Sequence, residues 1–213
     1  GKVFLEGKEV YIKTPSEAME KGIILLPEDR QKEGLIMSWG LGRNVTLPII
    51  SKYAKSGFND EKTEREISKK LLEEVDTKAV DIFQPASSLS GGNQQKVIIG
   101  RWLLTNPDYL ILDEPTAGLD PKGRDDILDQ IAELHKVRGI TIVLVSHSME
   151  DIAKYVERLI VMNHGEAVFD DKPKKVFSHY KELETMGLAA PQITYIMHAL
   201  KEHGLNVDAD ATT

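Results

Sequence analysis

The chain has 213 residues, and its 34 acidic against 27 basic side chains give a formal net charge of −7 at neutral pH. This acidic balance gives no electrostatic reason to expect binding of nucleic acid or of an anionic membrane surface. The absence of cysteine excludes disulfides and thiolate metal sites and makes a cytosolic location the default expectation. No apolar run approaches the roughly 20 residues that cross a bilayer, so we expect no direct membrane insertion.

The first thirty residues predict two short strands, a short helix and a third strand. Residues 1–13 alternate loosely between apolar and polar side chains, as in a hairpin. Thr14 and Pro15 open a capped helical turn that Gly22 ends, and Ile23–Pro27 is a short apolar strand.

A helical lobe is predicted to follow, from about Ile36 to Leu89. Its clearest part is the segment 59–76, where apolar residues recur at helical spacing and acids precede bases by four positions. We interpret the charged face of this helix as solvated surface without chemistry.

The second half alternates apolar strands with helices that begin near Pro121 and Met149, the pattern of an α/β fold. Near-continuous apolar strands predict a parallel sheet covered on both faces, built from Ile23–Leu26, Tyr109–Leu112, Ile140–Val145 and Arg158–Met162. A last strand at 167–170 and two closing helices are expected after it. The final helix should run from about Pro191 to His203 and stop at Gly204.

Three short motifs carry candidate chemistry. The run Leu89-Ser-Gly-Gly-Asn-Gln-Gln95 precedes a helical pattern, so its backbone N–H groups at the helix start would attract phosphate. Taken alone, this motif is weak, and an ordinary serine N-cap after a turn is the more common interpretation. An apolar strand ends in Asp113 and Glu114, where a carboxylate can hold Mg²⁺ or orient water, or cap the following turn. The next strand ends in Ser146 and His147. A lone histidine is more often structural, but one at the same sheet edge as two acids could meet a phosphate oxygen.

Taken in order, LSGG, the strand ending in DE, the turn GLD and the strand ending in SH resemble the nucleotide-binding domain of ABC transporters. The resemblance covers nearly the whole chain, and the spacing of the motifs makes it specific. It implies an α/β fold, a P-loop NTPase-like ABC ATPase core with a parallel sheet and a helical signature subdomain, truncated at its N-terminus.

The resemblance assigns roles to individual residues. It implies catalytic roles for Glu114 and His147, the latter as switch histidine, and a Mg²⁺ contact through water for Asp113. The remaining assignments are the ATP-binding signature, acting in trans, at Ser90, Gly91, Gly92 and Gln94, the D-loop at Asp120, and the Q-loop position at Glu28. The family usually has glutamine at this last position, which puts the ordinary positioning of Mg²⁺ and water in doubt, although related sugar-importer ATPases often carry the same Pro-Glu-Asp-Arg sequence.

The resemblance comes in two styles. Residues 1 to about 108 resemble the second ATPase domain of ribose- and galactose-type sugar importers, whereas residues from about 117 to 213 resemble the ATPase subunits of energy-coupling-factor importers for vitamins and metal ions. We hypothesise a junction between Leu110 and Thr116, from recombination, design or misassembly of two genes. A single divergent homologue is the alternative.

The phosphate-binding pattern G-x-x-x-x-G-K-[S/T], called Walker A, does not occur in the 213 residues. Because the family places that loop before the segment that Gly1 begins, we expect a partial domain. Its predicted parts are a core sheet region (1–35 and 107–175), a helical and signature subdomain (36–106) and C-terminal helices (176–213). DNA upstream of Gly1 would test this expectation.

The leading hypothesis is an ATPase of an ABC importer that couples ATP hydrolysis, with Mg²⁺, to uptake of a sugar, vitamin or metal ion. The alternative is a catalytically silent half that supplies only the LSGG face and transporter docking. A DNA-repair or chromosome ATPase is disfavoured because the long coiled-coil insertion of those proteins is missing. Expected partners are a second ABC ATPase domain and a transmembrane permease, with no nucleic acid, at the cytoplasmic face of the cell membrane.

Overall fold

The computed structural model describes residues 1–55, 58–208 and 211–212, and the chain divides into two compact units, Gly1–Val145 and Ser146–Thr213. The strands of the first unit are β1 (Val3–Leu5), β2 (Lys8–Val10), β3 (Ile23–Leu26), β4 (Ala54–Lys55), β5 (Phe58–Asn59), β6 (Tyr109–Asp113) and β7 (Thr141–Val145). Its helices are α1 (Pro15–Glu20), η1 (Arg30–Gly34), α2 (Leu41–Thr46), η2 (Leu47–Ile49), α3 (Ile50–Tyr53), α4 (Glu61–Glu74), η3 (Ala86–Ser88), α5 (Gly91–Leu103) and α6 (Pro121–Arg138).

The predicted start of the chain is confirmed. Strands β1 and β2 pair as an antiparallel hairpin. The Thr14 hydroxyl accepts a hydrogen bond from the Glu17 N–H and so caps α1, and Gly22 follows that helix with a φ of 71°. Both are the local signals that predicted the helix boundaries.

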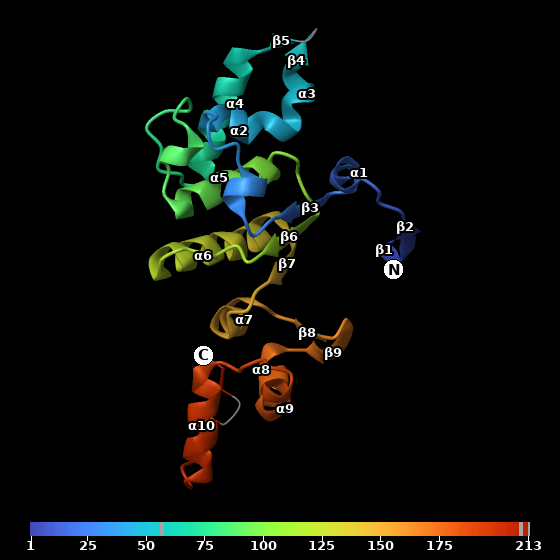
Figure 1. Cartoon of the computed structure of the whole chain (residues 1–213), viewed down its shortest axis with the longest axis vertical. Helices are drawn as coiled ribbons and strands as arrows, with labels where there is room; N and C mark the ends of the chain where they lie inside the picture. The colour runs from blue at the N-terminus through green and yellow to red at the C-terminus, as the bar shows by residue number, and fades with distance from the viewer. Residues whose placement is uncertain (56–57, 209–210, 213) are drawn as a thin grey trace. The chain divides into compact units, whose positions relative to one another are not determined.

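Three of the four predicted strands form the parallel sheet, in the order β3-β6-β7 (Figure 1). The register aligns Leu26 with Leu112 and Leu112 with Leu144. The residues that follow β3 and β6 therefore emerge at one edge of the sheet, the carboxyl edge, where open α/β sheets place their ligands.

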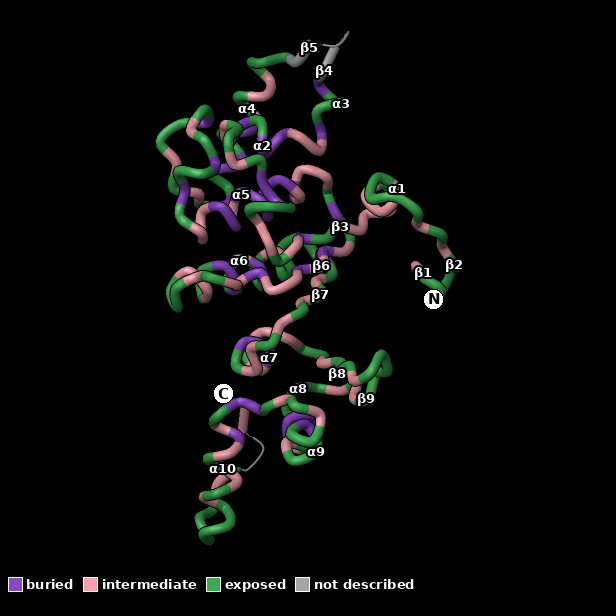
Figure 2. The backbone as a smooth tube through the Cα atoms, in the orientation of Figure 1, coloured by how far each residue is buried: buried purple, intermediate pink, exposed green. Residues whose placement is uncertain are grey.

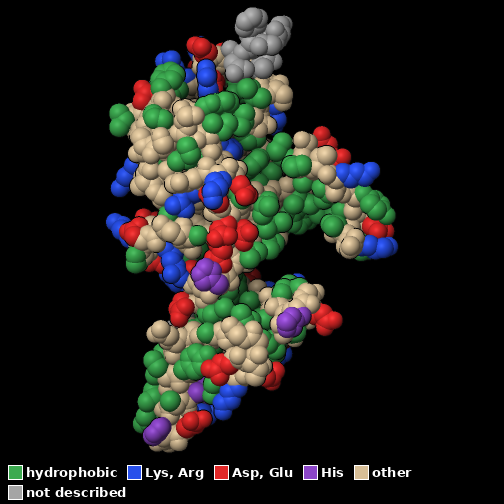
Figure 3. Space-filling model, viewed as in Figure 1, with side chains coloured by type: hydrophobic (Ala, Val, Ile, Leu, Met, Phe, Trp, Pro, Cys, Tyr) green, Lys and Arg blue, Asp and Glu red, His purple; other side chains and the backbone are tan. Residues whose placement is uncertain are grey.

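The prediction that the sheet is covered on both faces is wrong. One face is buried through Ile24, Leu26, Leu110 and Leu112, whereas on the other Leu25, Val143 and Val145 are 55%, 46% and 49% exposed. The order of the strands in the sheet follows their order along the chain. Connections between parallel strands are right-handed as a rule, so the two connections, one with α5 and one with α6, carry their helices to the same face of the sheet. Figure 3 shows hydrophobic side chains gathered over β3 and beside α1.

Residues 36–89 are largely helical, as expected, and β4 and β5 add a small antiparallel hairpin that the sequence pattern did not indicate. Helix α4 begins after Asp60, whose carboxylate accepts hydrogen bonds from the N–H groups of Lys62 and Thr63. It lies within the predicted segment 59–76 and contacts α2 and α5.

Helix α5 is the central helix of the first unit and is buried over most of its length (Figure 2). Near its end the guanidinium of Arg101 donates hydrogen bonds to three buried oxygens: the carbonyls of Gly34 and Asn44 and the side-chain amide oxygen of Asn44. Burial lowers the pKa of Arg101 to about 10, so the group stays charged near neutral pH, satisfied by neutral oxygens. This contact joins α5 to η1 and α2.

The second unit contains α7 (Met149–Tyr155), β8 (Leu159–Asn163), β9 (Glu166–Asp171), α8 (Pro173–Phe177), α9 (Tyr180–Thr185) and α10 (Gln192–Glu202). Its core is formed by Ile152, Val161, Val176, Phe177, Leu183 and Ala190. The last helix matches its predicted range closely, and Gly204 follows it at a φ of 85°.

The predicted fourth parallel strand, Arg158–Met162, is wrong. Among the described residues, β8 pairs only with β9, in an antiparallel sheet of two strands. His164 and Gly165 join them with φ values of 49° and 83°, the positive pair that a tight hairpin turn requires. Arg158 also donates two hydrogen bonds, of 2.6 and 2.7 Å, to the Asp170 carboxylate across the hairpin.

The predicted division of the chain into core sheet region, signature subdomain and C-terminal helices stays a prediction. A membrane-crossing helix is not found within residues 1–55, 58–208 and 211–212, where every helix is too short or too polar.

We predict that Arg101→Met lowers the free energy of unfolding by about 3 kcal/mol, because the buried carbonyls of Gly34 and Asn44 lose their donor. Arg43→Met, which removes an exposed guanidinium on α2, is the matched control and should change stability by less than about 0.5 kcal/mol. Urea unfolding measures both. Equal effects of the two substitutions would contradict the role given to Arg101.

Candidate functional site

The signature motif forms the turn into α5. Ser90 is the N-cap residue and is exposed, and its hydroxyl accepts a hydrogen bond of 2.9 Å from the Asn93 side chain. Among the described residues, the Ser90 side chain makes no capping bond to the helix backbone. The first-turn N–H groups of a 13-residue helix therefore keep their partial positive charge, which suits an anionic ligand.

The two glycines of the signature have different surroundings. A Cβ atom on Gly91 would lie 2.7 Å from Arg30 Nη2 and 3.2 Å from Leu119 Cδ2, whereas one on Gly92 would meet nothing within 4 Å. A side chain on Gly91 would therefore displace the Arg30 guanidinium from its present place. Gly92 leaves open space beside the helix start, where a phosphate can approach the backbone.

Gln94 is turned into the protein. Its side chain is 3% exposed and donates hydrogen bonds to the carbonyls of Ala86 and Leu89, at 3.3 and 3.1 Å. Its amide oxygen accepts from Arg30 Nε at 3.3 Å and from Gln31 Nε2 at 3.4 Å. Gln94 therefore holds the signature turn against neighbouring segments, and the predicted contact of this side chain with ATP has no support in its orientation.

The two predicted acids stand at the carboxyl edge of the sheet. Asp113 is the last residue of β6 and pairs in register with Val145, and the Glu114 N–H donates to the Val145 carbonyl at 2.9 Å. Glu114 has a φ of 42°, a left-handed conformation that costs a non-glycine residue roughly 1 kcal/mol or more. Strain of this kind is common where a side chain is held for function.

The D-loop follows directly from Glu114. The Glu114 carbonyl accepts from the Ala117 N–H at 3.0 Å, and Gly118 takes a φ of 68° in the turn. Asp120 is the exposed N-cap residue of α6. The turn thus connects the end of β6 to the start of α6, as the sequence predicted for GLDP.

Glu28 follows β3 by two residues and is exposed at the carboxyl edge of the sheet. Its carbonyl accepts a hydrogen bond from the Arg30 N–H at 3.1 Å. Since β3 and β6 are parallel and aligned, the residues after Leu26 and after Leu112 leave the sheet on the same edge. Glu28 therefore belongs to the same edge as Asp113.

Arg30 is the residue of this region that sequence reasoning missed. Its Nη1 donates to the Ala117 carbonyl at 2.8 Å and its Nε to Gln94, so one guanidinium joins the Q-loop segment to the D-loop and to the signature helix. These partners lie 87 and 64 residues away in the sequence. Only its place in the Pro-Glu-Asp-Arg motif gave a signal.

His147 lies in the second unit, two residues beyond Val145, and is exposed. Ser148 caps the following helix by accepting a hydrogen bond of 3.4 Å from the Asp151 N–H. The predicted meeting of His147 with Glu114 stays a prediction.

The acids fit a loosely held Mg²⁺ better than a protein-enclosed metal site. The described part of the chain contains no group of three or more His, Asp or Glu side chains placed to hold a metal ion. Mg²⁺ is usually bound by one or two carboxylates together with waters and substrate phosphates. The single strand-end carboxylate of Asp113 fits that kind of binding.

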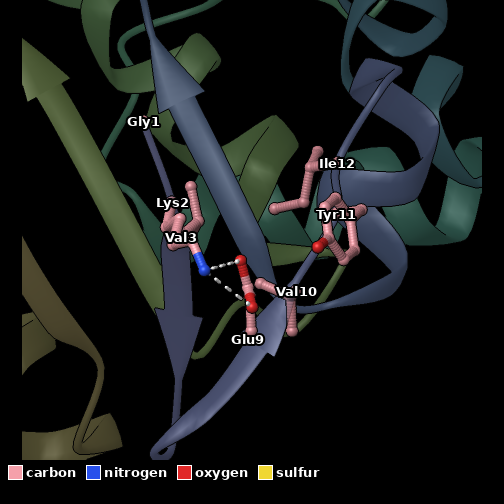
Figure 4. Close-up of a pocket in the computed structure, with 7 residues that line it drawn as sticks. All are labelled: Gly1, Lys2, Val3, Glu9, Val10, Tyr11 and Ile12. Atoms are coloured by element: carbon pink, nitrogen blue, oxygen red, sulfur yellow. Dashed lines mark hydrogen bonds and ion pairs between the residues drawn. The ribbon is translucent and has the colours of Figure 1, made fainter.

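A cavity of about 370 Å³ lies elsewhere, on the β1–β2 hairpin (Figure 4). It is lined by Gly1, Lys2, Val3, Glu9, Val10, Tyr11 and Ile12, and an ion pair of 3.2 Å joins Lys2 to Glu9 at its side. None of the motif residues lines this cavity, so its volume says nothing about the candidate site.

The family model described as ABC transporter matches residues 1–117, more than half of the chain. This chain belongs to the ABC transporter family. The predicted resemblance is therefore confirmed, and the parallel sheet with its helices agrees with the fold of solved ABC ATPases.

Both predicted kinds of relative are found. The energy-coupling factor transporter ATP-binding protein EcfA2 of Clostridium tetani is 41% identical over 194 residues, which are 89% of this chain and 67% of that protein. The ribose import ATP-binding protein RbsA 2 of Rhizobium johnstonii is 38% identical over 165 residues, 78% of this chain but 32% of that protein. The chain thus spans about a third of the length of the ribose-import relative.

A solved structure shows the same fold. The ATP-binding cassette MJ0796, determined as a dimer in a post-hydrolysis state bound to ADP and Pi, has a TM-score of 0.65 and 27% identity to this chain. The similarity covers 81% of this chain and 73% of that one. The predicted junction between two importer styles, near Leu110 to Thr116, stays a hypothesis.

We predict that Gln94→Leu lowers the free energy of unfolding by about 2 kcal/mol, because the carbonyl of Leu89 loses its side-chain donor, that of Ala86 keeps only the Leu89 N–H, and Arg30 loses an acceptor. Gln31→Leu removes only one long bond from an exposed side chain and serves as the control, with an effect below about 0.5 kcal/mol. Thermal unfolding of both variants gives the comparison. A Gln94→Leu protein as stable as the control would show that the turn does not depend on this amide.

Proposed function

We propose that this chain is an ATP-binding and ATP-hydrolysing subunit of an ABC importer, which couples ATP hydrolysis to solute uptake. The observation that carries the proposal is the convergence of the Q-loop segment, the signature turn and the D-loop on one guanidinium, that of Arg30. These segments come from distant parts of the chain, and the strand-end acids adjoin the D-loop. Family membership supports the same reaction class.

The proposed reaction is attack of water on the γ-phosphorus of ATP, with ADP as leaving group. Glu114 orients the attacking water, Asp113 holds Mg²⁺ through water, and His147 contacts the γ-phosphate. Mg²⁺ neutralises charge on the β- and γ-phosphates when it is bound. Such catalysis rests on positioning and on charge stabilisation, so the fixed backbone at Glu114 suits the role.

We propose that the signature turn acts on a nucleotide held by a second ATPase domain. Ser90 offers a hydroxyl, and Gly91 and Gly92 offer N–H groups, to phosphate oxygens bound across the interface. The open space beside Gly92 supports this arrangement, because a partner's phosphate can come close to the backbone there. Gln94 contributes by holding the signature turn in its conformation. Asp120 contributes as the N-cap residue that starts α6 directly after the D-loop.

A catalytically silent half is the second candidate function. It is favoured by the absence of G-x-x-x-x-G-K-[S/T] from the 213 residues, which leaves them without the loop that holds β- and γ-phosphates. In that case the chain supplies only the LSGG face and the surface that docks a permease. The two candidates differ in whether Glu114 ever works on a nucleotide bound to its own chain.

We propose two protein partners: a second ABC ATPase domain, homologous or identical, and a transmembrane permease subunit that this chain meets at the cytoplasmic face of the membrane. The permease surface is expected between Glu28 and about Ile82, where Trp39 is 39% and Val80 is 96% exposed. The helices after Phe177 resemble the dimer contacts of energy-coupling-factor importer ATPases, so we expect them to contact the second ATPase domain. The cargo, a sugar, vitamin or metal ion, is left open, because other subunits bind it.

We predict that the 213-residue polypeptide alone releases little phosphate from ATP, because Asp113 and Glu114 lack the lysine and N–H groups of a phosphate loop. Steady-state phosphate release measures this, with Glu114→Gln as control. Robust turnover by the polypeptide alone that Glu114→Gln abolishes would contradict the prediction and reveal a phosphate-binding loop of another sequence.

Mixing the polypeptide with an ABC ATPase domain that has an intact Walker A loop should complete one composite site. We predict phosphate release above that of the two proteins measured apart, and loss of this increment in Ser90→Arg, whose side chain fills the space beside the signature turn. Ser87→Arg, at the exposed middle residue of η3, is the matched control and should leave the increment intact. An increment indifferent to Ser90→Arg would rule out the action in trans.

A further inference from the structure

The side chain of Arg30 reaches three segments that converge on it. Nε donates to Gln94 in α5 at 3.3 Å, Nη1 donates to the carbonyl of Ala117 in the D-loop at 2.8 Å, and Nη2 lies against Gly91. The two acceptors are the side-chain amide oxygen of Gln94 and the backbone carbonyl of Ala117. A planar guanidinium can donate in two fixed directions at once, which is how a single side chain joins segments so far apart in sequence.

The contact to Ala117 extends toward Glu114. Arg30 holds the carbonyl of Ala117, and the N–H of Ala117 donates to the carbonyl of Glu114 at 3.0 Å. Glu114 in turn donates its own N–H to Val145 in β7 and keeps a φ of 42°. Arg30, 84 positions before Glu114, is therefore hydrogen-bonded to the turn that fixes the backbone of Glu114, the proposed catalytic acid.

The local structure around Arg30 is itself fixed. Asp29 precedes η1 and accepts hydrogen bonds of 3.1 Å from the N–H groups of Gln31 and Lys32. The Leu35 N–H donates to the Arg30 carbonyl at 2.8 Å, which closes the wide turn of η1. Gly34 allows η1 to lie against α5, because a Cβ there would come within 2.6 Å of Ile98 Cδ1. Arg30 thus projects from a turn whose backbone is tied at both ends.

Gly91 gives an independent sign that this place is specific for Arg30. The position a Cβ would take on Gly91 is 2.7 Å from Arg30 Nη2, so alanine there must move the guanidinium. Leu119 of the D-loop lies on the same side, at 3.2 Å. The absence of a side chain at Gly91 therefore lets the arginine and Leu119 of the D-loop lie against the start of α5.

We propose that Arg30 is a positioning residue that fixes the D-loop and the start of the signature helix relative to each other. The proposal rests on the proposed function for its catalytic consequence, since the signature turn then meets phosphate in the geometry that Arg30 sets. Lysine cannot replace it, because one ammonium group reaches one of the two acceptors and has no fork to join them. Arg30 itself is not placed on the nucleotide.

Amide hydrogen exchange of the full chain, followed by NMR, tests the positioning role without any nucleotide. In Arg30→Met the amides of Ala117 and Leu119 should exchange about fivefold faster or more, because the turn that these amides close has lost the hydrogen bond from Arg30 to the Ala117 carbonyl. The amides of β6 should exchange as before. Lys32→Met removes an 84% exposed cation from the same turn of helix and is the matched control, with no change in the D-loop.

Gly91→Ala provides a second arm. Because Leu119 also lies 3.2 Å from that Cβ, the coupling is measured at the amide of Ala117. Gly91→Ala should accelerate its exchange through Arg30, and in the Arg30→Met background it should add less than about twofold there, because both changes remove the same contact. Arg30→Lys keeps a cation and one contact, so it should fold like the parent and give an intermediate acceleration. It replaces Arg30→Met if the latter fails to fold.

The kcat and KM for ATP hydrolysis distinguish a positioning residue from one that only stabilises the fold. In the mixture with an intact Walker A partner, Arg30→Met should lower kcat about tenfold while KM for ATP stays within about twofold, since the partner's loop binds the nucleotide. Unchanged exchange at Ala117 and Leu119 in Arg30→Met, additive effects with Gly91→Ala, or an unchanged kcat in a mixture that still depends on Ser90 would each overturn the proposal. A mixture without Ser90-dependent activity refutes the proposed function instead, and the exchange data then decide the role of Arg30.

Discussion

The fold of the first unit depends on the attachment of η1 to the signature helix α5. Arg30, at the start of η1, donates to Gln94 in the first turns of α5, and Arg101, in its last turns, donates back to the carbonyl of Gly34 at the end of η1. Between them Gly34 lets Ile98 come close. Two guanidiniums with neutral oxygen acceptors thus hold a short, irregular segment along a buried helix.

This attachment decides where the motifs lie. Because η1 follows β3 directly, its position along α5 brings the start of the signature helix near the carboxyl edge of the sheet. The D-loop reaches the same place from the end of β6, and Arg30 connects the two. The proposed functional elements are therefore organised by contacts of backbone carbonyls, amides and arginine, and the acids at the edge are held by the backbone turn that starts at Glu114.

Local signals in the sequence predicted the elements well, because their causes are local. The cap at Thr14 and the glycines after α1 and α10 act within a few residues, so these helices began and ended close to the expected positions. The parallel pairing of β3, β6 and β7 followed from their apolar character and the helices between them.

The sequence pattern failed where the cause is a partner far along the chain. Apolar residues in β8 cannot tell a parallel neighbour from the antiparallel β9, and the turn at His164 and Gly165 decides between them. Which faces of the sheet are covered depends on whether each new strand is added on the same side of the sheet as the one before it. The periodicity of apolar residues carries no information on that order. The contacts of Arg30 span 64 and 87 residues. The inward direction of Gln94 depends on two carbonyls five and eight residues before it. Neither kind of contact leaves a recurrent pattern in the sequence.

We propose that the signature turn of this chain completes a nucleotide site on a second ABC ATPase domain. A crystal or cryo-EM structure of the polypeptide with a hydrolysis-deficient, Walker A-containing partner, ATP and Mg²⁺ tests it most directly. We expect the γ-phosphate, held by the partner, within about 3 Å of Ser90 Oγ and of the Gly92 N–H, with Arg30 still donating to the Ala117 carbonyl. Nucleotide bound with the signature turn facing solvent, or bound without any contact between the two proteins, would contradict it.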